Sequence, residues 1–585
     1  MCGIVGYIGN RNANEIILQG IRRLEYRGYD SVGACFVNEK EKRLEIKKDV
    51  GKIDDVHRKL NFLEPKSNLA ICHTRWATHG EVTKENAHPH CDCEKRIAIV
   101  HNGIIENYKE IRESLEAKGH KFESQTDSEV IAHLIEEFNR NLDFVSSCKK
   151  AFLMLQGSFA ILAVKCDEEK IVGVRKDSPL VVGINQNECF VASDIYALLP
   201  FTKNFIFLQN YDFVVIEKGR VYIENLIDGN VERKVERIDI NVEEIDKKDF
   251  HHFMIKEILE QADVFERAFN QNEENVERII GEIMKAKKIF LIGAGTSYHA
   301  CLAGSYLLAK AGILTKAIIA SEFNNFLSVV DENTLILAVS QSGETADVLD
   351  AVRKARKKGA KIISILNVYG SSLMRESDDY LLMNAGFEIG VAATKTYIAQ
   401  LSIFLLIYSK LTNKKINVEE VKAKIFDLLS RSRREHIEKV AQTLKNAQHV
   451  FLIGRGLEYV TALEAALKIK EISYIHAEAF PGGELKHGTI ALIDKGTPCI
   501  AFISKEKEKE ILSNVMEVRS RGGFIIGVAP DNCKEFDIWI KVPADEETSL
   551  VYQIIPMQLL AYRLAVLRGL DPDKPKNLAK SVTVL

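Results

Sequence analysis

The stretch Ile289-Phe290-Leu291-Ile292-Gly293-Ala294-Gly295 recurs as Val450-Phe451-Leu452-Ile453-Gly454-Arg455-Gly456. Each copy has the pattern of a buried strand that runs into a glycine turn and a helix. Two more strand-like runs repeat in the same order, residues 335–339 with 498–502 and residues 362–366 with 524–528. Strands that alternate with helices in this way predict two doubly wound α/β domains of parallel sheet, at residues 279–430 and 431–570.

The two copies differ in the turn after the second strand. The first copy has Ser340-Gln341-Ser342-Gly343-Glu344-Thr345 where a helix begins, whereas the second has Ser504-Lys505-Glu506-Lys507. A hydroxyl-rich turn at a helix N-terminus, beyond the carboxyl end of a parallel strand, can bind phosphate. The turn lacks the lysine of a Walker loop, and the stretch from Gly293 is not the full dinucleotide fingerprint, so we do not expect NAD. A helix-capping role would explain Ser340 alone, but not a set of hydroxyls that comprises Ser340, Ser342, Thr345, Thr296 and Ser297.

Residues 1–240 show a different pattern. Short β-rich runs such as 204–208 and 213–217 alternate with helical stretches such as 127–138. This pattern predicts an α+β domain with stacked antiparallel sheets. A charged, helix-prone stretch over residues 241–278 is typical of a linker, and we assign residues 571–585 to a C-terminal tail.

Cys2 follows the initiator methionine, whose removal would leave a thiol and a free α-amine on one residue. A thiolate is a strong nucleophile, and an α-amine with an unperturbed pKa near ~8 can serve as a general base. An inert terminus is the ordinary alternative for a single terminal cysteine. The density of polar groups downstream argues against that alternative. These groups occupy residues 26–31, 73–80, 86–90, 101–103 and 126–127.

Several residues in these runs have the chemistry to hold a free amino acid. Arg75 and Asp127 supply opposite charges for its zwitterionic end. Asn102 and Gly103 offer a side-chain amide and a backbone N–H to an oxyanion. Taken singly, Arg75 and Asp127 could form an ordinary surface ion pair, and Trp76 could be a core aromatic residue.

Residues 1 to about 240 resemble the glutaminase domain of class II amidotransferases, whose nucleophile is the N-terminal residue. The resemblance implies that Cys2 attacks the side-chain amide of glutamine, forms a thioester and releases ammonia. It implies that Trp76 lies on a mobile loop that closes over the substrate. It also implies that glutamine is bound by Arg75, Thr78, His79 and Asp127.

The C-terminal half resembles tandem sugar isomerase domains, and the whole chain resembles the isomerising, glutamine-dependent aminotransferases of sugar phosphates. The most specific signatures are residues 2–4, 73–80, 340–345, 469–478, 483–488 and 577–584. The resemblance implies glutamine and fructose 6-phosphate as substrates. Because an α-hydroxy carbonyl can itself enolise, we expect no pyridoxal group and no other cofactor.

By the same resemblance, Lys580 forms a Schiff base with the open ketose, Glu471 moves a proton between C1 and C2, and His487 assists ring opening. Lys468 stands three residues before Glu471 on one helix face, where a cation could steady an enediolate-like charge. The sugar phosphate would be bound by Thr296, Ser297, Ser340, Gln341, Ser342 and Thr345, with Val391 lining the site. The chain departs from the family pattern at Phe387, Ala393 and Thr489, without loss of a proposed catalytic group.

Composition limits the partners. Lys and Arg number 79 against 82 Asp and Glu, for a net charge of −3, so we expect no nucleic-acid partner. No uninterrupted apolar run reaches the ~18 residues of a membrane span, and the N-terminus lacks a signal-peptide pattern. Eleven scattered cysteines fit a reducing compartment, so we expect a cytoplasmic protein. The family resemblance implies a homodimer or higher homo-oligomer, with His487 completing the neighbouring subunit's site.

The segment His88-Pro89-His90-Cys91-Asp92-Cys93 offers four potential metal ligands in six residues. A tetrahedral site usually draws its ligands from two separated pairs, and four so close together could hardly converge on one ion. We therefore expect a hairpin connection before the strand-like run 96–100, and no metal.

Two other functions stay open on the sequence. A purine-pathway amidotransferase would share the glutaminase domain, but it would need an apolar strand ending in paired acidic residues to bind a phosphoribosyl donor. A non-catalytic sugar-phosphate sensor would explain residues 340–345, but it would leave Cys2, Glu471 and Lys580 without a role.

Overall fold

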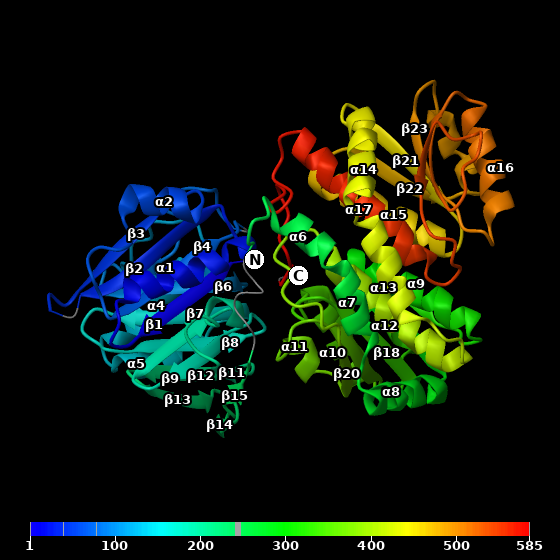
Figure 1. The fold of residues 1–585 in the computed structure, drawn as a ribbon. Coiled ribbons are helices and arrows are strands. Elements are labelled where there is room, and N and C mark those ends of the chain that lie inside the picture. Colours follow the sequence, from blue (N-terminus) through cyan, green and yellow to red (C-terminus); the bar gives the residue numbers. More distant parts are fainter. Residues whose placement is uncertain (1, 39, 78, 240–246, 584–585) are drawn as a thin grey trace. The chain divides into compact units, whose positions relative to one another are not determined.

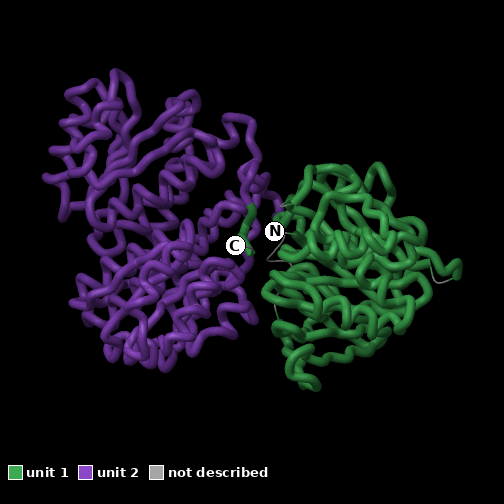
Figure 2. Tube along the Cα trace, turned by 180° about the vertical axis from the view of Figure 1, so that it is seen from behind, with its two compact units in different colours: residues 1–246, 579–585 green, residues 247–578 purple. Residues whose placement is uncertain are grey.

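The computed structural model describes residues 2–38, 40–77, 79–239 and 247–583, which divide into two compact units (Figures 1 and 2). Unit 1 comprises residues 1–246 together with the last stretch of the chain, Ala579–Leu585. Unit 2 comprises Lys247–Leu578. The tail that we expected at 571–585 is therefore divided between the units, with Lys580 in unit 1.

Two antiparallel sheets form unit 1, as the alternating short strands predicted. The first sheet has the order β15 (Glu236–Arg237), β11 (Asn204–Phe207), β9 (Val181–Asn185), β10 (Glu188–Ala192), β1 (Gly3–Ile8), β4 (Leu69–Arg75), β2 (Ser31–Asn38) and β3 (Arg43–Val50). The second has the order β14 (Gly229–Asn230), β13 (Arg220–Asn225), β12 (Asp212–Glu217), β8 (Ile171–Lys176), β7 (Gly157–Lys165), β6 (Ile97–Ile105) and β5 (His90–Cys91). The expected hairpin is confirmed, since His90 pairs with Ile99 across β5 and β6.

The sheets stack face to face, and helices cover their outer faces. On β6, Ala98 and Val100 belong to the core between the sheets, whereas Ile97 and Ile99 belong to the core under the helices. Because strand side chains alternate between faces, Asn102 points to the same side as Val100, toward the first sheet. The helices of unit 1 are α1 (Ala13–Arg23), α2 (Ile53–Leu60), α3 (Tyr108–Glu116), α4 (Glu129–Asn139) and α5 (Phe144–Leu153).

Unit 2 contains two parallel five-stranded sheets with the same topology, which confirms the doubly wound repeat. In chain order, each sheet has its second strand at the edge and its first strand beside it, followed by the third, fourth and fifth. The first sheet is β17 (Lys316–Ile319), β16 (Lys288–Gly293), β18 (Thr334–Ser340), β19 (Lys361–Leu366) and β20 (Asp379–Leu382). The second is β22 (His476–Pro481), β21 (His449–Gly454), β23 (Pro498–Phe502), β24 (Phe524–Ala529) and β25 (Ile538–Lys541).

The two sheets of unit 2 share one hydrophobic core. Leu291 and Leu337 of the first sheet and Leu452 and Ile500 of the second belong to a single buried cluster. Helices fill the layer between and around the sheets (Figure 1). They are α6 (Phe253–Leu259), α7 (Gln261–Phe269), α8 (Glu273–Lys285), α9 (Thr296–Lys310), α10 (Ala346–Lys357), α11 (Ser372–Arg375), α12 (Lys395–Thr412), α13 (Val418–Leu428), α14 (Arg431–Leu444), α15 (Leu457–Ser473), α16 (Glu508–Arg519) and α17 (Ser549–Leu567).

The stretch expected to be a linker, 241–278, differs in the structure. From Lys247 onward it belongs to unit 2, where Met254, Ile258 and Phe265 are fully buried in the shared core. The many charges of this segment suggested an exposed connection, but its apolar residues recur at helical spacing and form a buried face. Helix packing therefore places α6 and α7 in the body of unit 2.

Helix α17 is long and apolar enough to cross a membrane by length and composition alone. Within the described residues, 83% of its apolar window is buried inside the fold. It is a core helix of unit 2, where it packs against α15 and α14.

Candidate active sites

Cys2 lies at the start of β1, beside the end of β4. Gly3 pairs with Thr74, so Arg75, the last residue of β4, and Trp76, which follows the strand, come close to the thiol. The Trp76 N–H donates to Cys2 Sγ at 3.3 Å, and the thiol lies 3.6 Å from the Trp76 carbonyl oxygen. A Cβ on Gly28 would come within 2.6 Å of the Arg75 carbonyl carbon, so glycine at this position allows the approach.

The environment of Cys2 controls its ionisation. Burial raises the pKa of the Cys2 thiol, because a thiolate is poorly solvated there. The Trp76 N–H and the Arg75 charge act in the opposite direction and favour the thiolate, while Asp127 disfavours it. The charges of Arg75 and Asp127 therefore both influence the pKa of the Cys2 thiol.

The side chain of Asn102, on β6 of the second sheet, reaches the nucleophile Cys2. Its side-chain amide donates to the Cys2 carbonyl oxygen at 3.0 Å and to Ser193 Oγ at 3.1 Å. In this conformation the Asn102 amide group donates to both Cys2 O and Ser193 Oγ, and its Oδ1 atom is buried without a partner. Gly103 has a φ of +124°, and a Cβ there would lie 1.9 Å from the Ser158 carbonyl oxygen. Ser193 was not identified from the sequence.

Two of the proposed glutamine ligands, Arg75 and Asp127, have protein partners for their polar atoms, whereas His79 Nδ1 is buried without one. The Arg75 guanidinium donates to the carbonyl oxygens of residues 79–81. Asp127 Oδ2 accepts from the Ile105 N–H at 2.7 Å. The Trp76 indole packs edge-on against Tyr29, with ring centroids 5.5 Å apart, and His79 packs similarly against Tyr108. Thr78 lies outside the described residues.

A histidine cluster behind the Cys2 site was not predicted as a unit. It comprises His73, His88, His90 and His101, all buried. The rings of His73 and His88 stack with centroids 4.0 Å apart, and His73 Nε2 lies 2.9 Å from the His101 carbonyl oxygen. Burial lowers the pKa of all four imidazoles, to about 3 for His73, so they are neutral at pH 7.

The hydroxyl-rich turn lies where the sequence placed it, between β18 and α10. Ser340 Oγ accepts from the Gly343 N–H at 3.1 Å and lies 3.2 Å from Thr345 Oγ1. Ser342 Oγ accepts from the Glu344 N–H at 3.1 Å. Gly343 has a φ of +65°, and a Cβ there would clash with Ser371 Oγ at 2.1 Å. This conformation keeps the turn tight at the carboxyl end of the sheet.

The second candidate site in unit 2 is an acid–base cluster of Thr296, Glu464, Lys468 and Glu471. Lys468 Nζ donates to Glu471 Oε2 at 2.6 Å and to Thr296 Oγ1 at 3.1 Å, and lies 3.4 Å from Glu464 Oε1. Burial disfavours the Lys468 ammonium, but Glu471 and Glu464 outweigh that effect and raise its pKa. Helix α15 of the second sequence repeat thus contacts the start of α9 in the first repeat.

Glu464 was missed in the sequence, although its spacing could have identified it. It stands four residues before Lys468 and seven before Glu471, on the same face of α15. It is fully buried, accepts from Thr296 Oγ1 at 3.0 Å, and lies 2.7 Å from His299 Nδ1.

The other predicted residues have the following places. Ser297 Oγ accepts from the Gln400 amide at 3.0 Å, and the Gln341 carbonyl oxygen accepts from the Asn367 N–H at 3.1 Å. Val391 is buried, and its N–H donates to the Asp573 carbonyl oxygen at 3.2 Å. His487 is exposed at the end of the short 3-10 helix η5 (Leu485–His487). Lys580 is half-buried in the tail segment of unit 1, whereas Glu471 is in unit 2.

Comparison with known proteins covers both units. The glutamine amidotransferase domain matches residues 73–200, and the SIS domain matches residues 282–410 and 443–568. The glutamine–fructose-6-phosphate aminotransferase [isomerizing] of Pyrococcus horikoshii is 44% identical over the whole of both chains. The enzyme of that name from Thermus thermophilus is 42% identical, again over both entire chains. The chain belongs to the glutamine–fructose-6-phosphate aminotransferase [isomerizing] family.

A solved structure agrees with membership of the aminotransferase family. The C-terminal domain of glucosamine-fructose-6-phosphate aminotransferase from Francisella tularensis is 35% identical and has a TM-score of 0.53. It covers 56% of this chain and 99% of its own. Because the family is one of enzymes that have both domain types, neither a non-catalytic sensor nor a purine-pathway amidotransferase accounts for the whole chain.

Proposed function

We propose that this enzyme transfers the amide nitrogen of glutamine to fructose 6-phosphate and isomerises the product, giving glucosamine 6-phosphate and glutamate. The observation that carries the proposal is the buried Lys468–Glu471 pair, held against Thr296, in a chain that matches aminotransferases over its full length. A charged lysine and carboxylate at a sugar-binding domain would have no evident use in glutamine hydrolysis alone.

In unit 1, Cys2 Sγ attacks the side-chain carbonyl carbon of glutamine. The thiol proton passes to the amide nitrogen, the C–N bond breaks and ammonia leaves. Water then hydrolyses the thioester, which releases glutamate and restores the thiol. The Trp76 N–H supports the attacking sulfur from 3.3 Å. Asn102 and Gly103 stabilise the oxyanion, for which the Asn102 amide exchanges one of its bonds to Cys2 O or Ser193 Oγ. Arg75, Asp127, Thr78, His79 and Trp76 bind glutamine.

In unit 2, the phosphate is bound by the hydroxyl-rich turn, and the reacting carbons lie toward the acid–base cluster. The C2 carbonyl condenses with an amine and loses water to form an imine. Glu471 removes a proton from C1 and returns a proton to C2, which converts the 2-imine into a 2-amino aldose. Lys468 stays charged and steadies the negative charge that develops on oxygen between these steps. Substrate contacts come from Thr296, Ser297, Ser340, Gln341, Ser342, Thr345 and Val391.

Lys580 supplies the first imine. Its amine condenses with C2 of the open ketose, and ammonia from glutamine then displaces it. His487 assists ring opening. Because His487 is exposed on its own chain, we assign it to the site of a second subunit in a homodimer. We also place the enzyme in the cytoplasm, where glutamine and sugar phosphates are available.

Ammonia is mostly protonated at pH 7 and is then a poor nucleophile, so the nitrogen released at Cys2 must reach the sugar before it meets bulk water. Trp76→Ala should therefore let ammonia escape, and glutamate should form faster than glucosamine 6-phosphate. A folded variant whose two products stay equal would remove Trp76 from this role. A melting curve distinguishes escape from unfolding, which would lower both products.

The test of the proposed function is a coupled assay of glutamate and glucosamine 6-phosphate with glutamine and fructose 6-phosphate. Equal formation of both products supports the proposal. Glutamate without an amino sugar under saturating substrates would contradict it.

Borohydride tests the imine separately. Added with fructose 6-phosphate, it should reduce the Schiff base and leave a hexose adduct on the peptide that contains Lys580. Lys580→Arg keeps the charge but should give no adduct. An adduct on Lys468 or Lys486 would reassign the nucleophile.

A further inference from the structure

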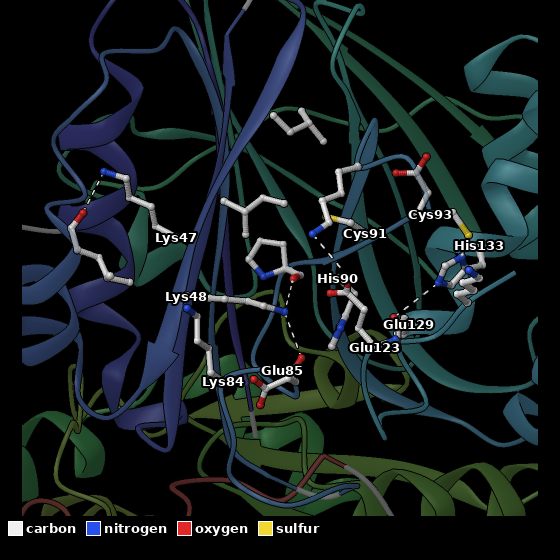
Figure 3. Close-up of a pocket in the computed structure, with 17 residues that line it drawn as sticks. Lys47, Lys48, Lys84, Glu85, His90, Cys91, Cys93, Glu123, Glu129 and His133 are labelled. Carbon is white, nitrogen blue, oxygen red and sulfur yellow. Dashed lines mark hydrogen bonds and ion pairs between the residues drawn. The ribbon is translucent and has the colours of Figure 1, made fainter.

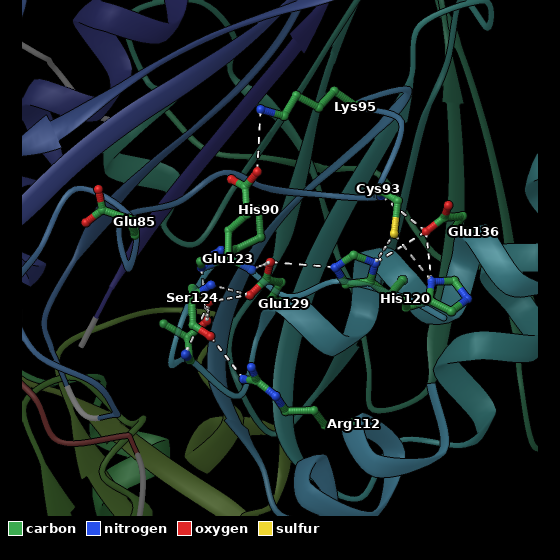
Figure 4. Close-up of polar contacts among 12 residues, drawn as sticks. Glu85, His90, Cys93, Lys95, Arg112, His120, Glu123, Ser124, Glu129 and Glu136 are labelled. Carbon is green, nitrogen blue, oxygen red and sulfur yellow. Dashed lines mark hydrogen bonds and ion pairs between the residues drawn. The ribbon is translucent and has the colours of Figure 1, made fainter. Parts of the chain in front are cut away.

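Four side chains that the amidotransferase chemistry does not use converge at one point of unit 1. We call them the Cys93 cluster: Cys93, His120, His133 and Glu136. Figure 4 labels Cys93, His120 and Glu136 of this cluster. Cys93 follows the short strand β5, His120 follows α3, and the other two stand on adjacent turns of α4. Ligands from three separate segments can surround an ion in a way that the six residues 88–93 cannot.

Four of the six distances between the ligand atoms are close to those of a tetrahedral metal site. Cys93 Sγ lies 3.8 Å from His120 Nδ1 and 3.5 Å from His133 Nδ1. Glu136 Oε2 lies 2.9 Å from His120 Nδ1 and 3.3 Å from His133 Nδ1. Bonds of about 2.0–2.3 Å at tetrahedral angles put neighbouring ligand atoms about 3.3–3.6 Å apart. All four atoms lie within 4.8 Å of one another.

A second layer of carboxylates lies behind both imidazoles, and the carboxylate behind His120 is within hydrogen-bond distance of its ring. Each ring turns Nδ1 to the centre and Nε2 outward, where Glu137 Oε2 lies 3.3 Å from His120 and Glu129 Oε1 lies 3.6 Å from His133. Glu129 is itself fixed, since it accepts from the N–H groups of residues 123 and 124. Carboxylates behind histidine ligands fix the tautomer that leaves the inner nitrogen available to a metal.

The cluster is sheltered and yet accessible. The side chains of His120 and His133 are 0% and 1% exposed, and that of Glu136 is 15% exposed. A pocket of 680 Å³ reaches Cys93 and His133, with Cys91 and Glu129 on its wall (Figure 3). An ion could therefore enter from solvent and be held by residues that lose little freedom on binding.

We propose that the Cys93 cluster binds a zinc-type divalent cation as a closed, structural site. One thiolate, two imidazoles and one carboxylate are ligands that suit Zn²⁺, whereas Mg²⁺ and Ca²⁺ prefer all-oxygen sets. On binding, the Cys93 S–H bond breaks, sulfur keeps the electron pair as a metal ligand, and the proton leaves to solvent. No electron is transferred.

The ion would fasten the turn after β5 to α4. Helix α4 begins at Glu129, two residues after Asp127, so the same helix anchors one of the proposed glutamine ligands. The alternative without metal is a hydrogen-bonded network, in which Glu136 Oε2 also accepts from the Cys93 N–H at 3.2 Å. Metal content distinguishes the two.

The experiment uses the full chain, stripped with a chelator and reloaded with Zn²⁺ or with Co²⁺ alone. We expect about one ion per chain, tight enough to survive gel filtration, and for Co²⁺ a visible spectrum with a sulfur-to-metal charge-transfer band. Cys93→Ser should lose that band and most of the bound metal. Cys91→Ser, in the same hairpin but outside the four ligands, should keep both. A wild-type chain that retains no metal, or equal binding by the two variants, would overturn the proposal.

A second measurement does not depend on the folding of a variant. Zn²⁺ should protect Cys93 of the wild-type chain from alkylation at least tenfold, whereas Cys533 should react at the same rate with and without the ion, since it belongs to unit 2 and not to the cluster. Alkylation of Cys93 that Zn²⁺ does not slow would contradict a Cys93–metal bond.

Discussion

The Cys2 site of unit 1 and the acid–base cluster of unit 2 keep buried titratable groups in opposite states. Behind the Cys2 site, the buried imidazoles of the histidine cluster are neutral, and burial raises the pKa of the nucleophile itself. In unit 2, by contrast, a fully buried lysine stays charged because two carboxylates surround it. A nucleophile that attacks a neutral amide needs few fixed charges, whereas proton transfer next to a sugar phosphate benefits from a fixed cation.

The largest expected effect comes from the carboxylate of the acid–base cluster. Glu471→Gln should lower glucosamine 6-phosphate formation by roughly 10²–10⁴-fold, because the amide cannot move the proton between C1 and C2. Glutamine hydrolysis should persist, since Cys2 belongs to the other unit. Parallel assays of both products check this. An equal loss of both activities in a folded variant would contradict separate chemistries.

Removal of the buried cation should destabilise unit 2. Lys468→Met leaves Glu464, which is 0% exposed, with a negative charge and no lysine partner. Loss of one member of a buried ion pair costs about 3–5 kcal/mol. Urea unfolding followed by hydrogen exchange should show the loss in unit 2 alone. The control is Lys505→Met, which removes an exposed cation of the same unit paired with Asp531 and should leave the midpoint unchanged.

Mild acid should weaken unit 1 before unit 2. The pKa of His73 is lowered to about 3 in the folded state, against about 6.5 when unfolded, so the unfolded state binds more protons between these values. Stability from this group is complete above pH ~6.5 and falls as the pH decreases, by about 2 kcal/mol from pH 6.5 to 5. The other three members of the histidine cluster act in the same direction.

An imidazole of the Cys93 cluster opposes this trend. Burial disfavours protonation of His133, but Glu129 and Glu136 outweigh it and raise the pKa, so this group favours the folded state in acid. His133 is a single imidazole, whereas the histidine cluster, which acts in the opposite direction, has four. Depressed carboxylate pKa values in unit 2 affect stability only below about pH 4.5. The denaturant midpoint of each unit at pH 7, 6 and 5 measures the difference in acid stability. A midpoint that decreases first in unit 2 would contradict the prediction that unit 1 weakens first.

The smallest expected effect concerns the backbone beside Cys2. Gly28→Ala places a Cβ within 2.6–2.7 Å of Arg75 and Trp76 main-chain atoms, so the Trp76 N–H must move away from Sγ. Overpacking of this kind costs about 1–3 kcal/mol, and a similar loss in the transition state slows glutamine hydrolysis roughly 10- to 100-fold. With ammonia as the nitrogen donor, synthesis should be unchanged. Gly281→Ala, which meets no atom within 4 Å, is the matched control.

The sequence predicted the architecture because periodicity and repeats are local signals. The strands from Lys288 and His449 and the turn from Ser340 to Thr345 lie where their patterns placed them. The histidine cluster could not be predicted in the same way, because its members come from distant segments, whereas Glu464 was missed although its spacing on α15 could have identified it. The linker expected over 241–278 shows the limit of composition, since charge density concealed the buried face that contains Met254 and Phe265. The Cys93 cluster was missed because only ligands adjacent in sequence were considered.

Rescue by ammonia tests the separation of the two chemistries most directly. Cys2→Ala and Glu471→Gln would each be assayed for glucosamine 6-phosphate with fructose 6-phosphate and either glutamine or an ammonium salt at pH 8.5, where more of the nitrogen is unprotonated. We predict that Cys2→Ala makes no amino sugar from glutamine but regains synthesis with ammonia, and that Glu471→Gln makes little from either donor. A folded Cys2→Ala enzyme that ammonia fails to rescue, or a Glu471→Gln enzyme that ammonia restores, would contradict the account.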